Sequence, residues 1–192
     1  MNRISQDMRS TRPFSLIIIA LLILAIVWIV MHSGIIKSNS TLAGEDQRVQ
    51  LQPPLATETL NKEYAFSLRD STGREVSKIK YEIISAEKRN EIIVKGQKAT
   101  AVKGRSFLIL NLKITNVYSK TVQIDARDYV RLMVNNSDEK LAPDIHNDPV
   151  EVQAISTKYT RLGFPINESD TNLTIQIGEI NGNKESIKLE LK

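Results

Sequence analysis

The chain has 192 residues, enough for one domain of ordinary size with an appendage. It contains no cysteine, which excludes disulfides, thiolate metal sites, a thiol nucleophile and the lipid-modified cysteine of a bacterial lipoprotein. Net charge is +4, with twelve Lys or Arg against five acids in residues 69–124 and eight against twelve in residues 125–192. We interpret both halves as solvated strand faces; anionic wall polymers or lipid headgroups are alternative partners of the basic half. Without a compact basic run carrying interleaved aromatics, no nucleic-acid partner is expected.

Near the N-terminus, Phe14–Met31 forms a run of eighteen residues without a charge. As a helix it would rise roughly 27 Å, close to the ~30 Å hydrocarbon thickness of a bilayer. Arg3, Arg9 and Arg12 precede this run, whereas the twenty residues after it contain two basic residues. The positive-inside rule therefore predicts a single-pass protein of the cell membrane, with residues 1–13 cytoplasmic and the C-terminal domain extracytoplasmic.

A cleaved signal peptide is the alternative interpretation of the same run. Signal peptides usually have an apolar region of 7–15 residues that ends at small residues. Here the run is longer, Met31-His32 is a poor cleavage site, and Thr41-Leu42-Ala43 is the nearest weak match. These features favour a transmembrane helix over residues 14–31.

The following segment, residues 32–62, has no sustained hydrophobic period and contains Pro53-Pro54. We expect it to be an extracytoplasmic linker. From Glu63 onward the pattern alternates apolar and polar residues, which predicts a β-rich domain over residues 63–192. After Met31, no stretch of ten or more residues shows a helical stripe.

Alternating positions predict seven or more short strands. The longest carries Leu108, Leu110, Leu112 and Ile114 on one face, and apolar residues at one end of its other face suggest a central strand covered there. Further strands are centred on Tyr81, Ile93, Val122–Ile124, Val130–Val134, Phe164, Ile175 and Leu189.

Turn residues separate these strands. Lys88–Asn90 and Asn135–Asp138 predict turns, Asn181-Gly182 predicts a tight hairpin, and Pro165 predicts an edge strand or a strand end. Asp148–Ser156 is expected to be a loop. Many half-buried antiparallel strands of this kind predict an all-β fold, an antiparallel sandwich.

Four short motifs over residues 76–192 agree with one another. Lys103-Gly104 precedes a strand that contains Phe107 and ends at Asn116, and three strand motifs follow at Asp128–Leu132, Leu162–Ile166 and Ile187–Leu191. Together they resemble a large bacterial family of exported immunoglobulin-like domains of unknown function. The resemblance implies an immunoglobulin-like β-sandwich on a lipoprotein or singly anchored protein, and no catalytic residues.

The chain departs from that family's pattern in three places. The lipoprotein cysteine is missing, Leu132 lies one position beyond its place in the motif, and Ile155-Ser156-Thr157 replaces the usual Pro-Gly turn.

Polar residues that could bind a metal are densest in the loop at Asp144, His146, Asn147, Asp148 and Glu151. Oxygen ligands suit Ca²⁺, and an imidazole would tolerate a transition metal. Their spacing matches no EF-hand or zinc pattern, so a solvated loop is the favoured interpretation. Asp144, His146 and Asp148 remain weak metal candidates, and no cofactor is expected.

Catalytic motifs give no support for an enzyme. His146 is the one histidine away from the apolar run, and neither G-x-S-x-G nor H-E-x-x-H occurs. S-x-x-K spacings at Ser77, Ser85 and Ser137 lack the partner motifs of the β-lactamase group. The sequence therefore predicts a non-catalytic, membrane-anchored domain that binds a protein or a cell-envelope component. The alternative is a structural accessory subunit of an envelope membrane complex.

Overall fold

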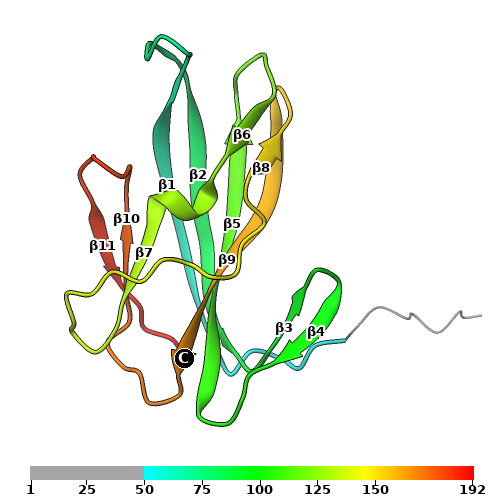
Figure 1. Ribbon diagram of the computed structural model, residues 1–192, viewed down its shortest axis with the longest axis vertical. Helices are drawn as coiled ribbons and strands as arrows, with labels where there is room; N and C mark the ends of the chain where they lie inside the picture. The colour runs from blue at the N-terminus through cyan, green and yellow to red at the C-terminus, as the bar shows by residue number, and fades with distance from the viewer. Residues whose placement is uncertain (1–49) are drawn as a thin grey trace, which may run out of the picture. The chain divides into compact units, whose positions relative to one another are not determined.

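The computed structural model describes residues 50–192 (Figure 1). These residues belong to one compact unit, residues 48–192. The predicted cytoplasmic segment 1–13, the predicted membrane helix 14–31 and the first part of the predicted linker lie outside the described residues. Within residues 50–192, no helix has the length and apolar character needed to cross a bilayer.

The described part of the chain is built almost entirely of β-strands. They are β1 Ala56–Arg69, β2 Glu75–Arg89, β3 Glu91–Val94, β4 Gln97–Thr100, β5 Arg105–Asn116, β6 Val122–Ile124, β7 Val130–Met133, β8 Val150–Val152, β9 Ser156–Asn167, β10 Thr174–Ile177 and β11 Glu185–Lys188. A short 3₁₀ turn, η1, spans Ala126–Tyr129. All the strand pairs are antiparallel, which confirms the all-β prediction.

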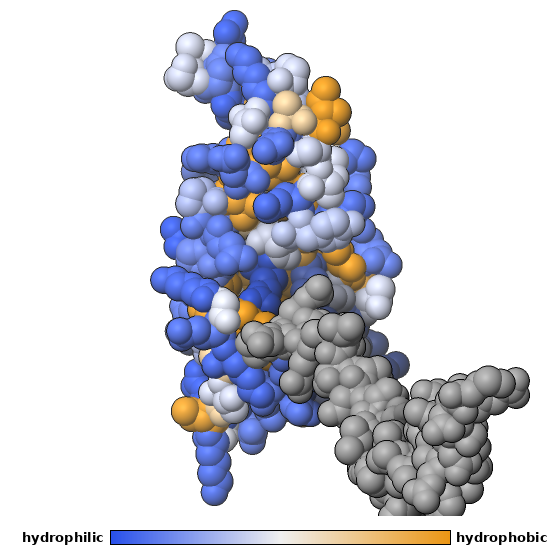
Figure 2. Space-filling view, turned by 90° about the vertical axis from the view of Figure 1, so that its right-hand side faces the viewer, coloured by the Kyte–Doolittle hydropathy of each residue, from blue (hydrophilic) through white to orange (hydrophobic). Residues whose placement is uncertain are grey.

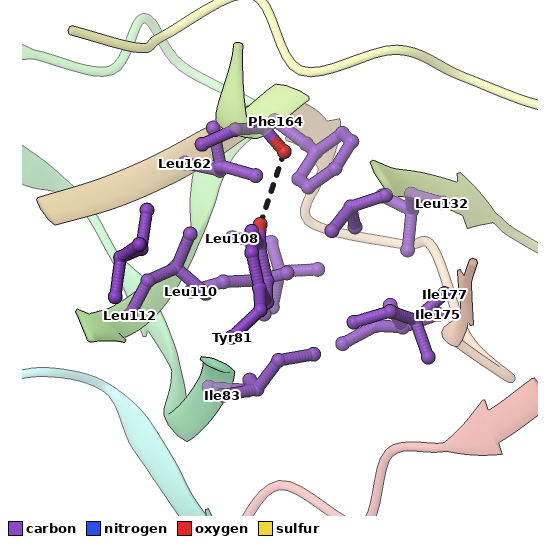
Figure 3. Packing of buried hydrophobic residues seen from close by; sticks show 14 of the residues in the cluster. Tyr81, Ile83, Leu108, Leu110, Leu112, Leu132, Leu162, Phe164, Ile175 and Ile177 are labelled. Carbon is purple, nitrogen blue, oxygen red and sulfur yellow. Dashed lines mark hydrogen bonds between the residues drawn. The ribbon is translucent and has the colours of Figure 1, made fainter. Parts of the chain in front are cut away.

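Two sheets form the layers of a β-sandwich. The larger has the order β1-β2-β5-β9 and the smaller has the order β11-β10-β7. Two-stranded ladders, β3-β4 and β6-β8, complete the fold. One hydrophobic cluster joins the sheets: Leu110, Leu162 and Tyr81 of the larger sheet face Leu132, Ile175 and Ile177 of the smaller (Figure 3).

Strand β5 occupies the centre of the larger sheet, as its pattern predicted. Leu108, Leu110, Leu112 and Ile114 are fully buried between the sheets. Ile109 points to the opposite face and is also buried, at 2% exposed, because Ile145 and Gly163 lie nearby on that face. The prediction of a central strand that is covered at one end of its outer face is confirmed.

Strand β9 forms one edge of this sheet. Leu162, Phe164 and Ile166 point into the core, and Pro165 pairs with Phe107 of β5. The edge position inferred from Pro165 is therefore confirmed, since proline has no N–H to give to a second neighbour.

The first strand begins earlier than the hydrophobic pattern indicated. Residues 56–62, which were assigned to the linker, belong to β1 and pair with β2 from Ala56 onward. The strand starts with mostly polar residues, and the register shifts between Thr59 and Lys62, around Asn61 at φ 47°. Because this interruption removes the alternation, the period-two signal became visible only from Glu63.

Other local predictions need correction. The 3₁₀ turn replaces the start of the predicted Asp128–Leu132 strand, and β8 lies inside the predicted loop Asp148–Ser156. The β10–β11 hairpin exists, but its ladder closes at Ile177 and Glu185, so Asn181-Gly182 lies in a longer loop and not in a tight turn. That loop is held by the Lys184 ammonium, which donates to the carbonyls of Glu179 and Ile180.

The second strand of the β3–β4 hairpin was not predicted. Lys95 and Gly96 connect the two strands with φ values of 50° and 79°, as in a two-residue type I′ turn. A lysine in the first of these positions is uncommon, so the turn carries a weak sequence signal.

Candidate functional site

The loop Asp144–Asp148, where the sequence placed its weak metal candidates, is attached to the edge of β9. The N–H of Gly163 donates to the carbonyl of Ile145 at 2.7 Å, and the N–H of Ile145 donates back at 3.1 Å. A Cβ at position 163 would lie 2.8 Å from Ile109 Cδ1 and 3.0 Å from Ile145 Cβ. Glycine is therefore required here so that the loop can approach the strand closely.

Asp148 is almost fully buried and binds the backbone. Its carboxylate accepts the N–H groups of Ala126 and Arg127, both at 2.9 Å, at the start of η1. Its side chain is 1% exposed, and the Arg127 guanidinium lies 4.0 Å away. The residue thus holds the 3₁₀ turn in place and already has a cationic neighbour.

His146 lies between the same two residues. Its Nε2 is 3.1 Å from a guanidinium nitrogen of Arg127, and its Nδ1 is 3.6 Å from the Asp148 carboxylate. Because arginine only donates, Nε2 must accept, which puts the proton of the neutral ring on Nδ1, facing Asp148. The N–H of Asp148 also lies 3.2 Å from Nδ1, but a neutral ring has a single acceptor nitrogen, and in this tautomer Nε2 is that acceptor.

The structure does not gather the predicted ligands into a metal site. Asp144 and Glu151 are exposed, on the loop and on β8 respectively. Among residues 50–192, no group of three His, Asp or Glu side chains is placed to hold a metal ion. A cation at Asp148 and His146 would also meet the positive charge of Arg127.

A cleft of about 540 Å³ separates this loop from the β3–β4 hairpin. Its polar lining consists of Lys95, Arg161, Asp144, His146, Asn147 and Asp148. The Arg161 guanidinium donates to the carbonyl of Ile93, so the hairpin is tied to β9. The lining contains charges of both signs but neither a hydroxyl nor a thiol, and its amine, guanidinium, carboxylate and imidazole groups offer polar contacts to a ligand.

A second pocket of about 430 Å³ was not foreseen. Asp125, Asp128 and Glu179 line it together with Tyr129 and Arg69. Burial raises the pKa of Tyr129, and the nearby charges of Glu179, Asp128 and Asp125 raise it further. These residues come from the end of β1, the β6–η1 segment and the β10–β11 loop, so no local sequence pattern connects them.

Most aromatic side chains of the domain lie in the core or pack against it. Phe66, Tyr81 and Phe164 are buried, and the rings of Phe66 and Tyr129 stack with their centroids 4.3 Å apart. The Tyr81 hydroxyl donates to the carbonyl of Ala126 at 3.0 Å (Figure 3). Tyr159 is the exception, because its side chain is 67% exposed.

Asn116, at which the first family motif ends, has a structural role. The two hydrogens of its fully buried amide nitrogen are shared among the carbonyls of Lys120, Val152 and Gln153, at 2.9–3.1 Å. Its oxygen accepts the N–H of Tyr118 at 2.9 Å. One side chain therefore joins the loop after β5 to the end of β8, which explains an asparagine at this position without any catalytic function.

Comparisons with known proteins identify no function. No family model matches the chain, and no curated protein matches it. Among solved structures, a conserved hypothetical protein from Bacillus anthracis has a TM-score of 0.47 at 15% identity, over 69% of this chain and 96% of that one. An uncharacterized β-sandwich protein from Clostridium difficile 630 has a TM-score of 0.47 at 14% identity, over 58% and 85%. A functionally unknown protein from Listeria monocytogenes EGD-e has a TM-score of 0.39 at 13% identity, over 67% and 86%.

Proposed function

We propose that the chain is a single-pass membrane protein that displays an immunoglobulin-like sandwich on the outer side of the cell membrane. The uncharged run Phe14–Met31 and the three arginines before it support this topology. The short motifs of the sandwich, with their resemblance to exported bacterial domains, agree with it.

Protease added to intact spheroplasts tests this topology. We expect degradation of the chain beyond His32, with residues 1–13 protected until the cells are lysed. Full protection of the C-terminal domain before lysis would contradict an outward orientation.

We further propose that the domain is a non-catalytic module that binds a protein or a cell-envelope component. The observation that supports this best is that polar side chains of the loop Asp144–Asp148 bind groups of the domain itself. Asp148 and His146 hold η1 and Arg127, while the adjacent cleft presents the charged side chains of Lys95, Arg161 and Asp144. Groups arranged in this way serve recognition better than bond cleavage.

The accessory-subunit alternative places the partner contacts on the membrane helix. The two possibilities are separated by isolating the full chain from detergent-solubilised membranes, beside a variant in which an unrelated transmembrane helix replaces residues 14–31. We expect partners to be retained by both chains. Loss of every partner from the helix-replaced variant would instead support the accessory role.

A further inference from the structure

The outer edge of β9 is open over half its length. Residues of a strand point their N–H and C=O groups alternately to either side, and those of Gly163 point away from β5, toward Ile145. The backbone groups of Thr157, Tyr159 and Arg161 therefore share this outward direction. Within residues 50–192, no hydrogen bond to these outward groups is formed.

The other half of the same edge is closed. The loop carrying Ile145 pairs with Gly163, and Pro165 has no N–H to offer. At the opposite side of the sheet, the edge of β1 is also occupied at intervals: Thr57 donates to the carbonyl of Lys192, and Ser67 donates to Glu179. Proteins generally protect exposed edges in such ways, and three successive outward residues of the segment 157–161 have no such protection from the described part of the chain.

A groove runs beside this open segment. Strand β8 forms its other wall, because β8 pairs with β6 and not with β9, although β8 and β9 follow each other in the chain. Two hollows of about 310 and 350 Å³ lie between residues 149–153 and 156–160, and they share Glu151 and Lys158. The second also shares Asn147 with the 540 Å³ cleft that contains Arg161. The hollows therefore follow one another along the strand edge.

The side chains around the groove indicate what would fit there. Tyr159, 67% exposed, stands in the middle of the open segment, and Ile155, 77% exposed, precedes it. Lys158, Arg161 and Lys95 are the basic residues along the groove. Of the acidic ones, Glu151 and Asp144 are exposed, whereas the Asp148 side chain is 1% exposed and its carboxylate already accepts two backbone N–H groups. Seen from the side, the domain surface is mostly hydrophilic with small separate apolar areas (Figure 2). An apolar contact at Tyr159 and an anionic contact at Arg161 would complement these residues.

We propose that an extended segment of a partner protein adds to the larger sheet as a strand beside β9 at residues 157–161. Its main chain exchanges hydrogen bonds with Thr157, Tyr159 and Arg161. An apolar side chain of the segment packs on Tyr159, and an acidic one lies near Arg161 and Lys95. This inference rests on the proposed binding function and names the site and the class of partner.

The test uses the full chain in lipid nanodiscs and a displayed library of random decapeptides. Enriched peptides are synthesised, and their Kd is measured by fluorescence polarisation for the wild type, Tyr159→Pro and Tyr159→Ala. Proline removes an N–H that points away from β5, so the native ladder is kept; circular dichroism checks the fold. We expect Tyr159→Pro to bind about tenfold more weakly than Tyr159→Ala, since it alone loses a main-chain hydrogen bond.

Charge and specificity are examined with the same peptides. Lys95→Asn keeps a residue that tolerates a positive φ while removing a charge, and it should weaken acidic peptides several-fold. Hydrogen exchange at the amides of Tyr159 and Arg161 should slow when peptide is bound.

Three results would overturn the inference. The first is equal enrichment of peptides on the wild type and on Tyr159→Pro, and the second is no enrichment on the wild type at all. The third result is a full-chain dimer that Tyr159→Pro converts to a monomer, because the edge would then pair with a second copy. If cellular partners are retained through the domain but do not depend on Tyr159, the binding function stands and the β9 site fails.

Discussion

Single polar side chains hold the connections of this domain together. Asn116, Asp148 and Tyr81 each bind backbone groups of a loop or turn from a largely buried position. Such bonds contribute little net free energy when made but leave costly unpaired groups when one partner is removed. At the residue scale, therefore, Asp148, which the sequence offered as a metal candidate, binds backbone groups of the domain itself.

Asn116→Ala tests this conclusion. The substitution leaves the carbonyls of Lys120, Val152 and Gln153 without their donor, so we expect the free energy of unfolding to fall by about 2–4 kcal/mol in urea titrations. Asn111→Ala is the matched control in the same strand: its amide binds Ser85 and Glu87 on the solvent side and should cost about 1 kcal/mol or less. Equal losses for the two variants would show that the buried amide has no special role.

Alkaline pH should destabilise the domain through its buried phenols. Burial, and then the charges of Asp148 and Tyr129, raise the pKa of Tyr81 well above its usual range, and burial raises that of Tyr64 to about 12. The unfolded chain loses these protons near pH 10, whereas the folded chain keeps them. The stabilisation is therefore complete below pH 10 and is lost as the pH rises toward the folded-state values.

Tyr81→Phe checks the assignment. At pH 8 it should lower the free energy of unfolding by about 1–3 kcal/mol, because the Ala126 carbonyl loses its donor. Between pH 8 and pH 11, urea titrations should show a smaller loss of stability for the variant than for the wild type. An identical pH dependence of the two proteins would mean that Tyr81 does not carry the effect.

Strand β5 shows how one element separates core from surface. Residues with even numbers from Leu108 to Ile114 face the core, while Asn111 and Lys113 face solvent. The Lys113 ammonium lies 2.8 Å from a Glu82 carboxylate on the neighbouring strand. Partly exposed cross-strand ion pairs of this kind contribute little to the free energy of unfolding.

Alanine substitutions at adjacent positions of β5 should therefore differ widely. Leu112→Ala removes a fully buried side chain and should cost about 2–5 kcal/mol. Lys113→Ala removes a partly exposed ion pair and should cost about 0.5 kcal/mol or less. Chemical denaturation of both variants measures the difference, and similar losses would contradict the assignment of faces.

At the scale of the whole molecule, residues 48–192 form a unit with its own hydrophobic cluster. Its size is within the usual range for a single domain, so burial of the core can offset the conformational entropy of the chain. The start of β1 at Ala56 also shows where a soluble fragment must begin, because a fragment from residue 60 would lose four residues of the edge strand.

We predict that a fragment of residues 50–192 folds alone as a β-rich protein and needs no metal. Circular dichroism should show strand structure, and a chelator should leave the melting temperature unchanged within about 1 °C, because Arg127 already neighbours Asp148 and His146. A decrease of several degrees on chelation would indicate a structural ion at the Asp144–Asp148 loop. A largely helical spectrum would contradict the sandwich.

The sequence by itself determined the elements whose burial alternates, together with the apolar run near the N-terminus. A buried face can be recognised locally, because apolar residues alternate with other residues within each of the short segments Leu108–Ile114 and Leu162–Ile166. Tertiary structure alone decided the polar start of β1, the acidic pocket of Asp125, Asp128 and Glu179, the capping role of Asp148 and the open edge of β9. These features depend on which distant segments pair and which backbone groups remain unpaired. Hydrogen bonding between residues far apart in the chain produces no periodic pattern in the sequence of either segment.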